Sequence, residues 1–433
     1  MATFLKDISK VGFSKILIIG CGVLNSVIVA RTLGPEKNGI IASVLVYPAI
    51  FLIFSSLGIS NASTFFLGKG LIAEKEIKKA ICYIWCFTSL FSIFSCYLLL
   101  HFFTNVETDN WIIILAILPI PFTLLNTYNS GVYLGKNQID IFNKISWVPY
   151  AITLSLTIFF LVIFNFGIKG FFYAYLGGPV FIFVVLLFKS NLFKYLKGVP
   201  NWPVIRQMLQ LGSVYALALV IVKLHYQIDI ILLNQLSTPY EVGIYTKGAV
   251  ITEYLWQIPM LFNTVVFARS AISKDDRVFS LKVVQLLRIS LVIIGVAGLV
   301  LELLSNFIVT LFYGKAFEES SSVLMILVPG VLLLTFYKIL NTDLHGKGKP
   351  WVAIKAMLPG LIINVLLNLY LIPKFGSDGA AMSSTISYSF AAIIFIIIYS
   401  KEVDIPLRQI FNFKINDFDP IFQMVNKIFK INQ

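Results

Sequence analysis

Twelve apolar stretches, each about 20 residues long, follow one another along this chain of 433 residues. A helix of about 20 apolar residues is long enough to cross the roughly 30 Å hydrocarbon core of a bilayer. Because 58% of the residues are hydrophobic and only 13% are charged, soluble domains of ordinary size could not bury so much apolar side chain. The sequence therefore predicts an all-α polytopic membrane protein with about twelve transmembrane helices, at residues 13–33, 40–64, 80–103, 111–134, 145–165, 170–189, 209–234, 243–267, 283–312, 321–342, 352–372 and 378–399.

The chain repeats its plan after about 210 residues. The motif that runs from Phe166-Gly167 to Gly170 returns from Phe375-Gly376 to Gly379, and the spacing from Pro35 to Gly39 returns from Pro239 to Gly243. Duplicated bundles are typical of membrane transporters, which bind substrate between the two repeats. We expect an N-terminal lobe at residues 1–190 and a C-terminal lobe at residues 209–400, each with six helices.

Two further segments look interfacial. Residues 191–208 link the lobes, and residues 401–433 form a tail in which one helical face collects Ile421, Phe422, Val425, Ile428 and Phe429. Such a face suits a helix that lies on an anionic membrane surface. The linker carries Phe193, Leu196 and Trp202 and could bind the surface in the same way. A disordered tail and a simple linker are the alternatives.

Lysine and arginine residues indicate the orientation. Alternate loops and ends place 24 of them on one side of the predicted bundle and five on the other, namely Arg31, Lys37, Lys169, Lys315 and Lys374. By the positive-inside rule, both termini are predicted to be cytoplasmic. The net charge of +13 is therefore explained by topology, and no nucleic-acid partner is expected.

Loop lengths and motifs argue against several enzyme classes. Every predicted outer loop has about ten residues or fewer, too few for an extracytoplasmic catalytic domain, and the sequence contains no Walker A motif. Cys82 and Cys86 are helical neighbours without histidine or carboxylate company, which favours packing over a metal site or a disulfide. We expect no metal and no cofactor. The acid pair Asp275-Asp276 is interpreted as a solvated loop, and the segment from Gly346 to Lys349 as a turn.

Charged residues inside the spans distinguish the two halves. Spans two to six carry none away from their ends, whereas the second half carries them within or at the edges of its spans, at Lys223, Asp229, Lys247, Glu253, Arg288, Glu302, Lys338 and Lys355. Arg288, Lys338 and Lys355 lie near cytoplasmic ends, where a long side chain can reach water. Lys223 lies about a dozen residues, or roughly 18 Å, from either end of its helix, and burying it in lipid would cost roughly 2.5–3.5 kcal/mol.

Lys223 should therefore face a hydrated cavity or a carboxylate. Glu253, on the next span, is the nearest candidate partner in depth, and a structural ion pair and a substrate-facing lysine are both open. His225 and Asp229 are four residues apart on the same helix, so they could form a proton-accepting pair or a packing hydrogen bond. Arg31 ends the first span, where it could close a cavity electrostatically or anchor the helix at the headgroups.

The stretch from Ala30-Arg31 through Leu33-Gly34-Pro35 to Gly39 resembles the A-R-x-L-G-P-x-x-x-G signature of bacterial polysaccharide transporters. These belong to the multidrug/oligosaccharidyl-lipid/polysaccharide (MOP) flippase superfamily, and the order of further short motifs over residues 10–400 agrees with it. The resemblance implies two six-helix lobes, as in the multidrug (MATE) branch, around a cationic central cavity. Lys223, Arg31 and Lys247 match that cationic theme. Asp229, His225, Glu253 and Glu302 are candidates for ion or proton coupling, or for charge partners.

The resemblance also implies a function. It is that of a flippase, not an enzyme, which moves undecaprenyl-diphosphate-linked oligosaccharide repeat units of O-antigen or capsule type from the inner to the outer leaflet of the bacterial cytoplasmic membrane. Its partners would be this lipid-linked substrate, membrane lipids and, as a further option, a polysaccharide polymerase or other assembly proteins. A lipid II-type flippase and a small-solute or drug antiporter of the same fold remain alternatives. A membrane glycosyltransferase or polymerase is the enzyme alternative, which the short outer loops disfavour.

Overall fold

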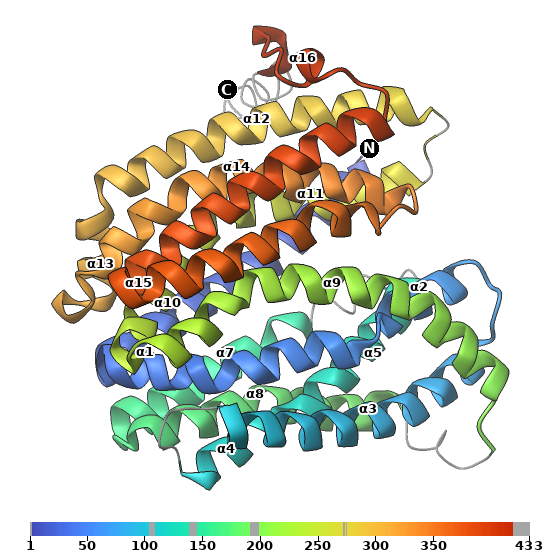
Figure 1. The fold of residues 1–433 in the computed structure, drawn as a ribbon. Coiled ribbons are helices and arrows are strands. Elements are labelled where there is room, and N and C mark those ends of the chain that lie inside the picture. Colours follow the sequence, from blue (N-terminus) through green and yellow to red (C-terminus); the bar gives the residue numbers. More distant parts are fainter. Residues whose placement is uncertain are drawn as a thin grey trace, which may run out of the picture. The chain divides into compact units, whose positions relative to one another are not determined.

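The computed structural model describes residues 2–103, 109–136, 138, 145–190, 199–271, 273 and 275–418. Over these ranges the chain is helical and contains no strand (Figure 1). Eight helices of the described part are long and apolar enough to cross a membrane. Two of them, α1 (Ala2–Ser56) and α15 (Val352–Glu402), are interrupted by a glycine with non-helical dihedral angles, Gly34 and Gly376, so each covers two predicted spans. The prediction of a multi-pass all-α membrane protein is confirmed.

The remaining helices follow the predicted spans in chain order. Shorter helices abut one another in several spans: α4 (Asn110–Ile117) precedes α5 (Pro119–Gly135), and α7 (Val148–Thr157) continues into a π-helical turn at Ile158–Ile163. The others are α2 (Ile59–Gly68), α3 (Glu74–Phe103), α8 (Gly167–Ser190), α9 (Trp202–Leu236), α10 (Pro239–Glu253), α11 (Gln257–Ala271), α12 (Asp276–Leu303), α13 (Ser305–Tyr313), α14 (Ser320–Gly346) and α16 (Leu407–Ile410).

The chain forms two compact units. The first unit comprises the chain up to Thr246 together with Val309–Glu319, and the second unit comprises Lys247–Ile308 and the chain from Ser320 onward. The division falls within α10, whereas the repeat in the sequence suggests lobes that end near residue 190 and begin near residue 209. Those lobe boundaries stay a prediction. The predicted interfacial face at residues 421–429, and Phe193 and Leu196 of the linker, lie outside the described residues.

The repeated motif of the sequence is a repeat of backbone conformation. Gly167 and Gly376, the first glycines of the two copies, have φ values of +59° and +54°, a region that side chains rarely adopt. The second glycines allow close packing. A Cβ at Gly379 would lie 2.4 Å from the carbonyl oxygen of Leu371, and one at Gly170 would lie 3.1 Å from that of Phe160.

A second pair of repeated glycines makes a reciprocal contact within the first unit. A Cβ on Gly39 would lie 1.6 Å from the carbonyl oxygen of Pro239, and a Cβ on Gly243 would lie 2.0 Å from that of Pro35. Each glycine thus packs against the proline that opens the equivalent helix of the other repeat. Only hydrogen at both positions allows these backbones to come so close.

Tightly packed side chains hold the first unit together around α3 and α5. Ile77 and Ile81 of α3 and Ile120 and Leu124 of α5 are fully buried. Tyr128 of α5 is also fully buried, and its hydroxyl donates a 2.6 Å hydrogen bond to the carbonyl of Ser55 in α1. Because these helices are fixed to one another, the polar side chains on their other faces have defined positions.

Two local predictions in the second unit are confirmed. The segment from Gly346 to Lys349 is a turn, with Gly348 at φ +75° and the backbone N–H of Lys347 bonded to the carbonyl of Asp343. Asp275 and Asp276 are both exposed, as predicted for a solvated acid pair, although Asp276 is already the first residue of α12. Asp275 caps this helix, because its side chain accepts a 3.0 Å hydrogen bond from the backbone N–H of Val278.

Candidate functional site: a cavity in the first unit

A cavity of about 610 Å³ lies inside the first unit. Its walls are the first part of α1 together with Leu52 near the end of that helix, α5 from Thr123 onward, the segment from Ile145 into the start of α7, and α8 from Tyr175 to Leu186. The volume is in the middle of the range of roughly 300–1,000 Å³ that is usual for small-ligand sites. None of the charged residues singled out in the sequence lines it.

Glycine and proline residues shape this cavity. A Cβ at Gly178 of α8 would lie 2.5 Å from the carbonyl oxygen of Pro149, so α7 and α8 are in close contact there. On the opposite wall, a Cβ added at Gly22 of α1 would have no atom within 4 Å, so there is open space in front of α1 at this position. Pro179 lies inside α8 and cannot donate to the carbonyl of Tyr175 one turn earlier. Tight packing on one side and small residues on the other leave the space unfilled.

Most of the lining surface is apolar, but it carries many uncharged polar side chains and few charges. It includes hydroxyl and amide side chains, three tyrosines and one cation, namely Ser14, Asn25, Thr123, Asn126, Ser130, Ser146, Thr153, Tyr133, Tyr150, Tyr175 and Lys15. Among the described residues that line it there is no carboxylate. Such a surface can hydrogen-bond many hydroxyl groups, place aromatic rings against sugar faces and attract an anion at the Lys15 end.

Asn25 offers an unused acceptor to this cavity. Its side-chain oxygen Oδ1 is buried and has no hydrogen-bond partner within the described part of the chain. A buried acceptor without a donor costs about 1–3 kcal/mol. A hydroxyl group of a ligand, or a water molecule, would therefore be stabilised at this position.

Sequence reasoning missed these residues because it searched the spans for charge. A weaker signal was present, since Thr123, Asn126, Ser130 and Tyr133 recur at helical spacing along one face of α5. Ser14, Gly22 and Asn25 do the same on α1. Two polar or small faces on apolar helices predict that the helices share a hydrated space.

Four of the charged residues predicted for the site belong to the first unit. Arg31 is exposed at the end of the first span, where its Nε and Nη2 donate hydrogen bonds of 2.9 and 2.5 Å to the carbonyls of Phe312 and Leu311. These are carbonyls of the last turn of α13, which have no helical donor and carry partial negative charge. The guanidinium thus joins α1 to the C-terminus of α13, a contact that the sequence did not suggest.

The other three lie on α9. Asp229 is fully buried and accepts a 2.8 Å hydrogen bond from the hydroxyl of Tyr245 on α10. His225 is also fully buried, and Lys223 is half-buried. The Asp229 to Tyr245 bond gives the buried carboxylate a donor that the sequence did not suggest.

Lys247, Glu253 and Glu302 belong to the second unit. Lys247 is buried, Glu253 is exposed at the C-terminal end of α10, and Glu302 is half-buried near the end of α12. The pairing of Lys223 with Glu253 stays a prediction, since the two residues belong to different units.

Two of the cations expected to reach for water have other partners. Lys338 holds its Nζ 3.8 Å from the ring centroid of the buried Trp256, a cation–π contact. Arg288 is 7% exposed, and its side chain binds the segment that follows α15. Lys355 is exposed, as expected. Helix periodicity gives the depth of a residue but does not identify the side chains that cover it.

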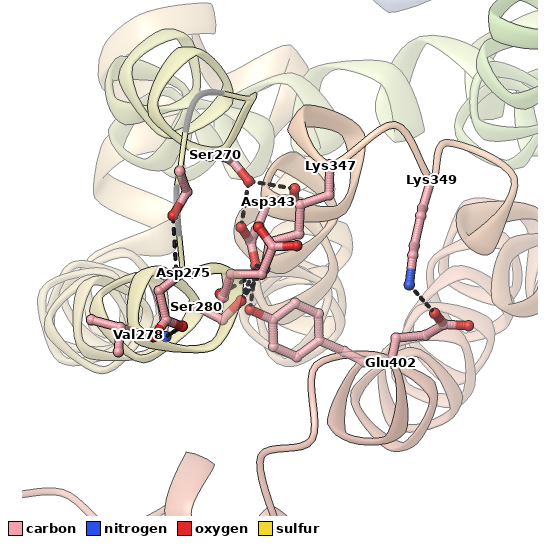
Figure 2. Close-up of polar contacts among 11 residues, drawn as sticks. Ser270, Asp275, Val278, Ser280, Asp343, Lys347, Lys349 and Glu402 are labelled. Carbon is pink, nitrogen blue, oxygen red and sulfur yellow. Dashed lines mark hydrogen bonds and ion pairs between the residues drawn. The ribbon is translucent and has the colours of Figure 1, made fainter.

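Asp343 organises the second unit in a way that the sequence analysis missed. Its carboxylate is fully buried at the end of α14 and accepts hydrogen bonds from Ser270 of α11, Ser280 of α12 and Tyr399 of α15, at 2.6, 2.6 and 2.7 Å. Lys347, one turn further along α14, forms an ion pair with it at 3.1 Å. Figure 2 shows Ser270, Ser280 and Lys347 gathered around this carboxylate. One carboxylate therefore joins the ends of four helices, which is a structural role.

Comparison with known proteins decides the family. The model of a family described as polysaccharide biosynthesis protein matches residues 28–322, more than half of the chain. The chain belongs to this family. The predicted resemblance to polysaccharide transporters is thereby confirmed.

Curated relatives match over shorter stretches. A probable low-salt glycan biosynthesis flippase of Haloferax volcanii is 29% identical over 90 residues, which are 21% of this chain and 19% of the relative. A capsular polysaccharide biosynthesis protein of Staphylococcus aureus is 32% identical over 111 residues, which are 25% of this chain and 28% of the relative. The aligned stretches thus span about a fifth to a quarter of these relatives.

Solved structures share the fold over nearly the whole chain. The lipid II flippase MurJ, in an inward closed conformation, matches with a TM-score of 0.72 at 14% identity, and the match covers 98% of this chain and 96% of the MurJ chain. An inward-facing multidrug resistance transporter of the MATE family matches with a TM-score of 0.69 at 15% identity, and the match covers 89% of this chain and 94% of the transporter. This polysaccharide biosynthesis protein therefore has the twelve-helix fold of the MOP superfamily.

Proposed function

We propose that this chain is a flippase that moves undecaprenyl-diphosphate-linked oligosaccharide repeat units, of O-antigen or capsule type, from the inner to the outer leaflet of a bacterial cytoplasmic membrane. Membership of the polysaccharide biosynthesis family and the MOP fold support a lipid-linked glycan as the substrate class. The names of two relatives, a glycan biosynthesis flippase and a capsular polysaccharide protein, agree with it. In this proposal the chain transports its substrate and performs no covalent chemistry.

The cavity of the first unit carries the proposal. Its hydroxyl groups, amides and tyrosines suit a sugar, and Lys15 suits an anionic group. A drug antiporter for cationic compounds would need a carboxylate where this lining has none among its described residues. The sugars and the diphosphate cannot cross hydrocarbon unaided, whereas the polyprenyl tail can remain in lipid.

The location of the cavity suits loading from the inner leaflet. Most of its lining residues come from four spans, largely from the halves that the positive-inside rule places on the cytoplasmic side: Ser14 to Asn25, Thr123 to Tyr133, Ile145 to Thr153 and Tyr175 to Leu186. Leu52, in the middle of a fifth span, also lines the cavity. A head group that enters from the cytoplasm would meet Lys15 first. Alternating access would then open the path toward the outer side.

Deeper charges would assist the later part of the path. We assign Lys223, Arg31 and Lys247 to lowering the barrier for the diphosphate, and Asp229, His225, Glu253 and Glu302 to ion coupling or charge balance. Arg31 can act in this way only in a state that releases α13, because its donors are engaged there. Outward movement of an anionic head gains roughly 2.3 kcal/mol per charge for each 100 mV of membrane potential. The potential would therefore drive export even without a coupling ion.

Two glycines on α1 provide a matched test. Gly22 and Gly20 both have open space around a built Cβ, but only Gly22 lines the cavity. Gly22→Leu should block the movement of a fluorescent lipid-linked oligosaccharide between the leaflets of proteoliposomes, whereas Gly20→Leu should leave the rate nearly unchanged. Both variants should insert and purify equally, because a Cβ at either position would have no atom of the fold within 4 Å.

The outcomes separate the candidate functions. Equal rates in the two variants would contradict binding of the head group in this cavity. Transport of lipid II in place of the oligosaccharide would favour the lipid II-type alternative. Export of a cationic dye without lipid-linked sugar transport would favour the antiporter.

A further inference from the structure

The segment from Val403 to Phe418 folds back onto α12 through one buried arginine. Arg288 donates from Nε to the carbonyl of Ile410 at 3.0 Å, from Nη2 to that of Gln409 at 2.6 Å, and from Nη1 to the carboxylate of Asp417 at 2.8 Å. Gln285, one turn earlier on α12, donates to the carbonyl of Asp417 at 3.1 Å. These bonds use the planar donor fork of the guanidinium, so Arg288 fixes the segment in place.

A pocket of about 560 Å³ remains between α12 and this segment. Arg408, Lys414 and Asn412 of the segment line it, opposite Gln285 and Arg288 of α12. The carboxylate of Asp417 also lies at the pocket, but it already accepts hydrogen bonds from Arg288 and from the backbone N–H of Lys414. The pocket therefore has an excess of positive charge.

Two of its cations are available to a ligand. The side chains of Arg408 and Lys414 are exposed, and neither makes a hydrogen bond or an ion pair with any residue that the structure describes. Asn412 adds an exposed amide that can donate or accept. A phosphate group matches this combination, since arginine and lysine bind its oxygens and an amide can complete the contact.

The same segment exposes large apolar side chains. Ile415 is 83% exposed, and Phe411 and Phe413 are each 47% exposed. The segment begins directly after α15 ends at Glu402, where a spanning helix leaves the bilayer. Cations alternating with exposed aromatic and aliphatic residues next to a bilayer are typical of a peptide that lies in the headgroup region.

We infer that this pocket binds the phosphate of an anionic phospholipid of the adjacent leaflet, while Phe413 and Ile415 enter the boundary between headgroups and acyl chains. A soluble phosphate would leave those apolar side chains without a partner, whereas a lipid satisfies both features at once. Arg408 and Lys414 supply the charge, and Arg288 holds the segment that carries them. This site is separate from the substrate cavity and does not depend on the proposed transport function.

The test compares lipid retention by purified full-length protein. Phosphatidylglycerol should remain bound in native mass spectra under conditions that remove phosphatidylcholine. The double variant Arg408→Gln, Lys414→Gln should bind it about 30-fold more weakly, from the attraction expected for two cations near an anionic surface. The control Lys282→Gln, Lys401→Gln removes two exposed cations of the same unit that do not line the pocket, and it should retain the lipid.

Two further arms identify the source of the phosphate. Ile415→Ser removes an apolar contact but no charge, and it should weaken retention of phosphatidylglycerol without changing thermal stability. Millimolar glycerol phosphate should not displace the lipid. Equal retention in the pocket and control variants would overturn the proposal, as would displacement by glycerol phosphate, which would make the pocket a site for soluble anions.

Discussion

Replacement of Asp343 by asparagine tests the idea that one carboxylate holds the second unit together. The change keeps the size of the side chain and removes its charge. The hydroxyls of Ser270, Ser280 and Tyr399 would lose a charged acceptor, and Lys347, whose side chain is 7% exposed, would lose its ion-pair partner.

The expected cost follows from burial. The carboxylate is fully buried and serves three hydroxyl donors besides the lysine, and removal of one partner of a buried pair costs about 3–5 kcal/mol. For a unit of this size, such a loss corresponds to a fall of about 6–20 °C in the unfolding temperature. The same substitution at the exposed helix cap, Asp275→Asn, should change stability by less than about 0.5 kcal/mol, because asparagine caps helices as well as aspartate does.

A double-mutant cycle completes the test. Lys347→Met combined with Asp343→Asn restores neutrality, so the double variant should cost at least about 1 kcal/mol less than the sum of the single variants. Unfolding of the second unit can be followed by tryptophan fluorescence, because Trp256 of that unit is buried in the native protein. Additive losses, or a loss at Asp343 no larger than at Asp275, would show that the carboxylate does not organise these helices.

Two other predictions concern charge in the tail and in the path. Burial by itself raises the pKa of Asp417. The hydrogen bonds from Arg288 and from the backbone of Lys414 lower this pKa by more than burial raises it, so the pKa lies below its usual value. The contribution of Asp417 to docking is therefore complete above the unfolded pKa of about 3.9 and is lost as the pH falls through the lower folded value. The mobility of a spin label at Ile415→Cys should stay constant at pH 5–7 and rise only below about pH 4. A change of mobility near pH 6 would contradict this assignment. Lys223→Ala should abolish surface glycan in a strain that depends on this protein, without lowering the amount of the protein in the membrane. Replacement of the exposed Lys355 by alanine should leave surface glycan unchanged. Normal surface glycan in the Lys223 variant would rule out the proposed role of Lys223.

The fold was largely predictable because a bilayer restricts what an apolar chain can do. Stretches of about 20 apolar residues must be helices when their backbone polar groups have no water to bind, and the repeated glycines mark equivalent turns. Gly167 and Gly376 share a sequence motif because they share a positive φ. Helical spans, the turn at Gly346 and the family resemblance all depend on such local signals.

The site was less predictable because its residues are ordinary in isolation. Hydropathy detects Lys223 as a charge in a span but does not detect Asn25 or Thr123, whose meaning comes from the neighbours across a cavity. Arg288 was expected to reach for water, yet residues more than 120 positions later in the chain cover it. The structural role of Asp343 depends on hydroxyl donors from the ends of three other helices. Long-range contacts of this kind leave no periodic trace in one sequence.

The contact between Gly39 and Gly243 has a consequence for how such a chain could arise. Each glycine faces the proline of the other copy, so the contact is isologous, as across the two-fold axis of a homodimer. A half-length ancestor would have placed one and the same glycine twice at that axis. After gene fusion, the two positions could mutate independently, yet a side chain at either would force the backbones apart. Two codons in one gene thus remain under a constraint that formerly applied to one.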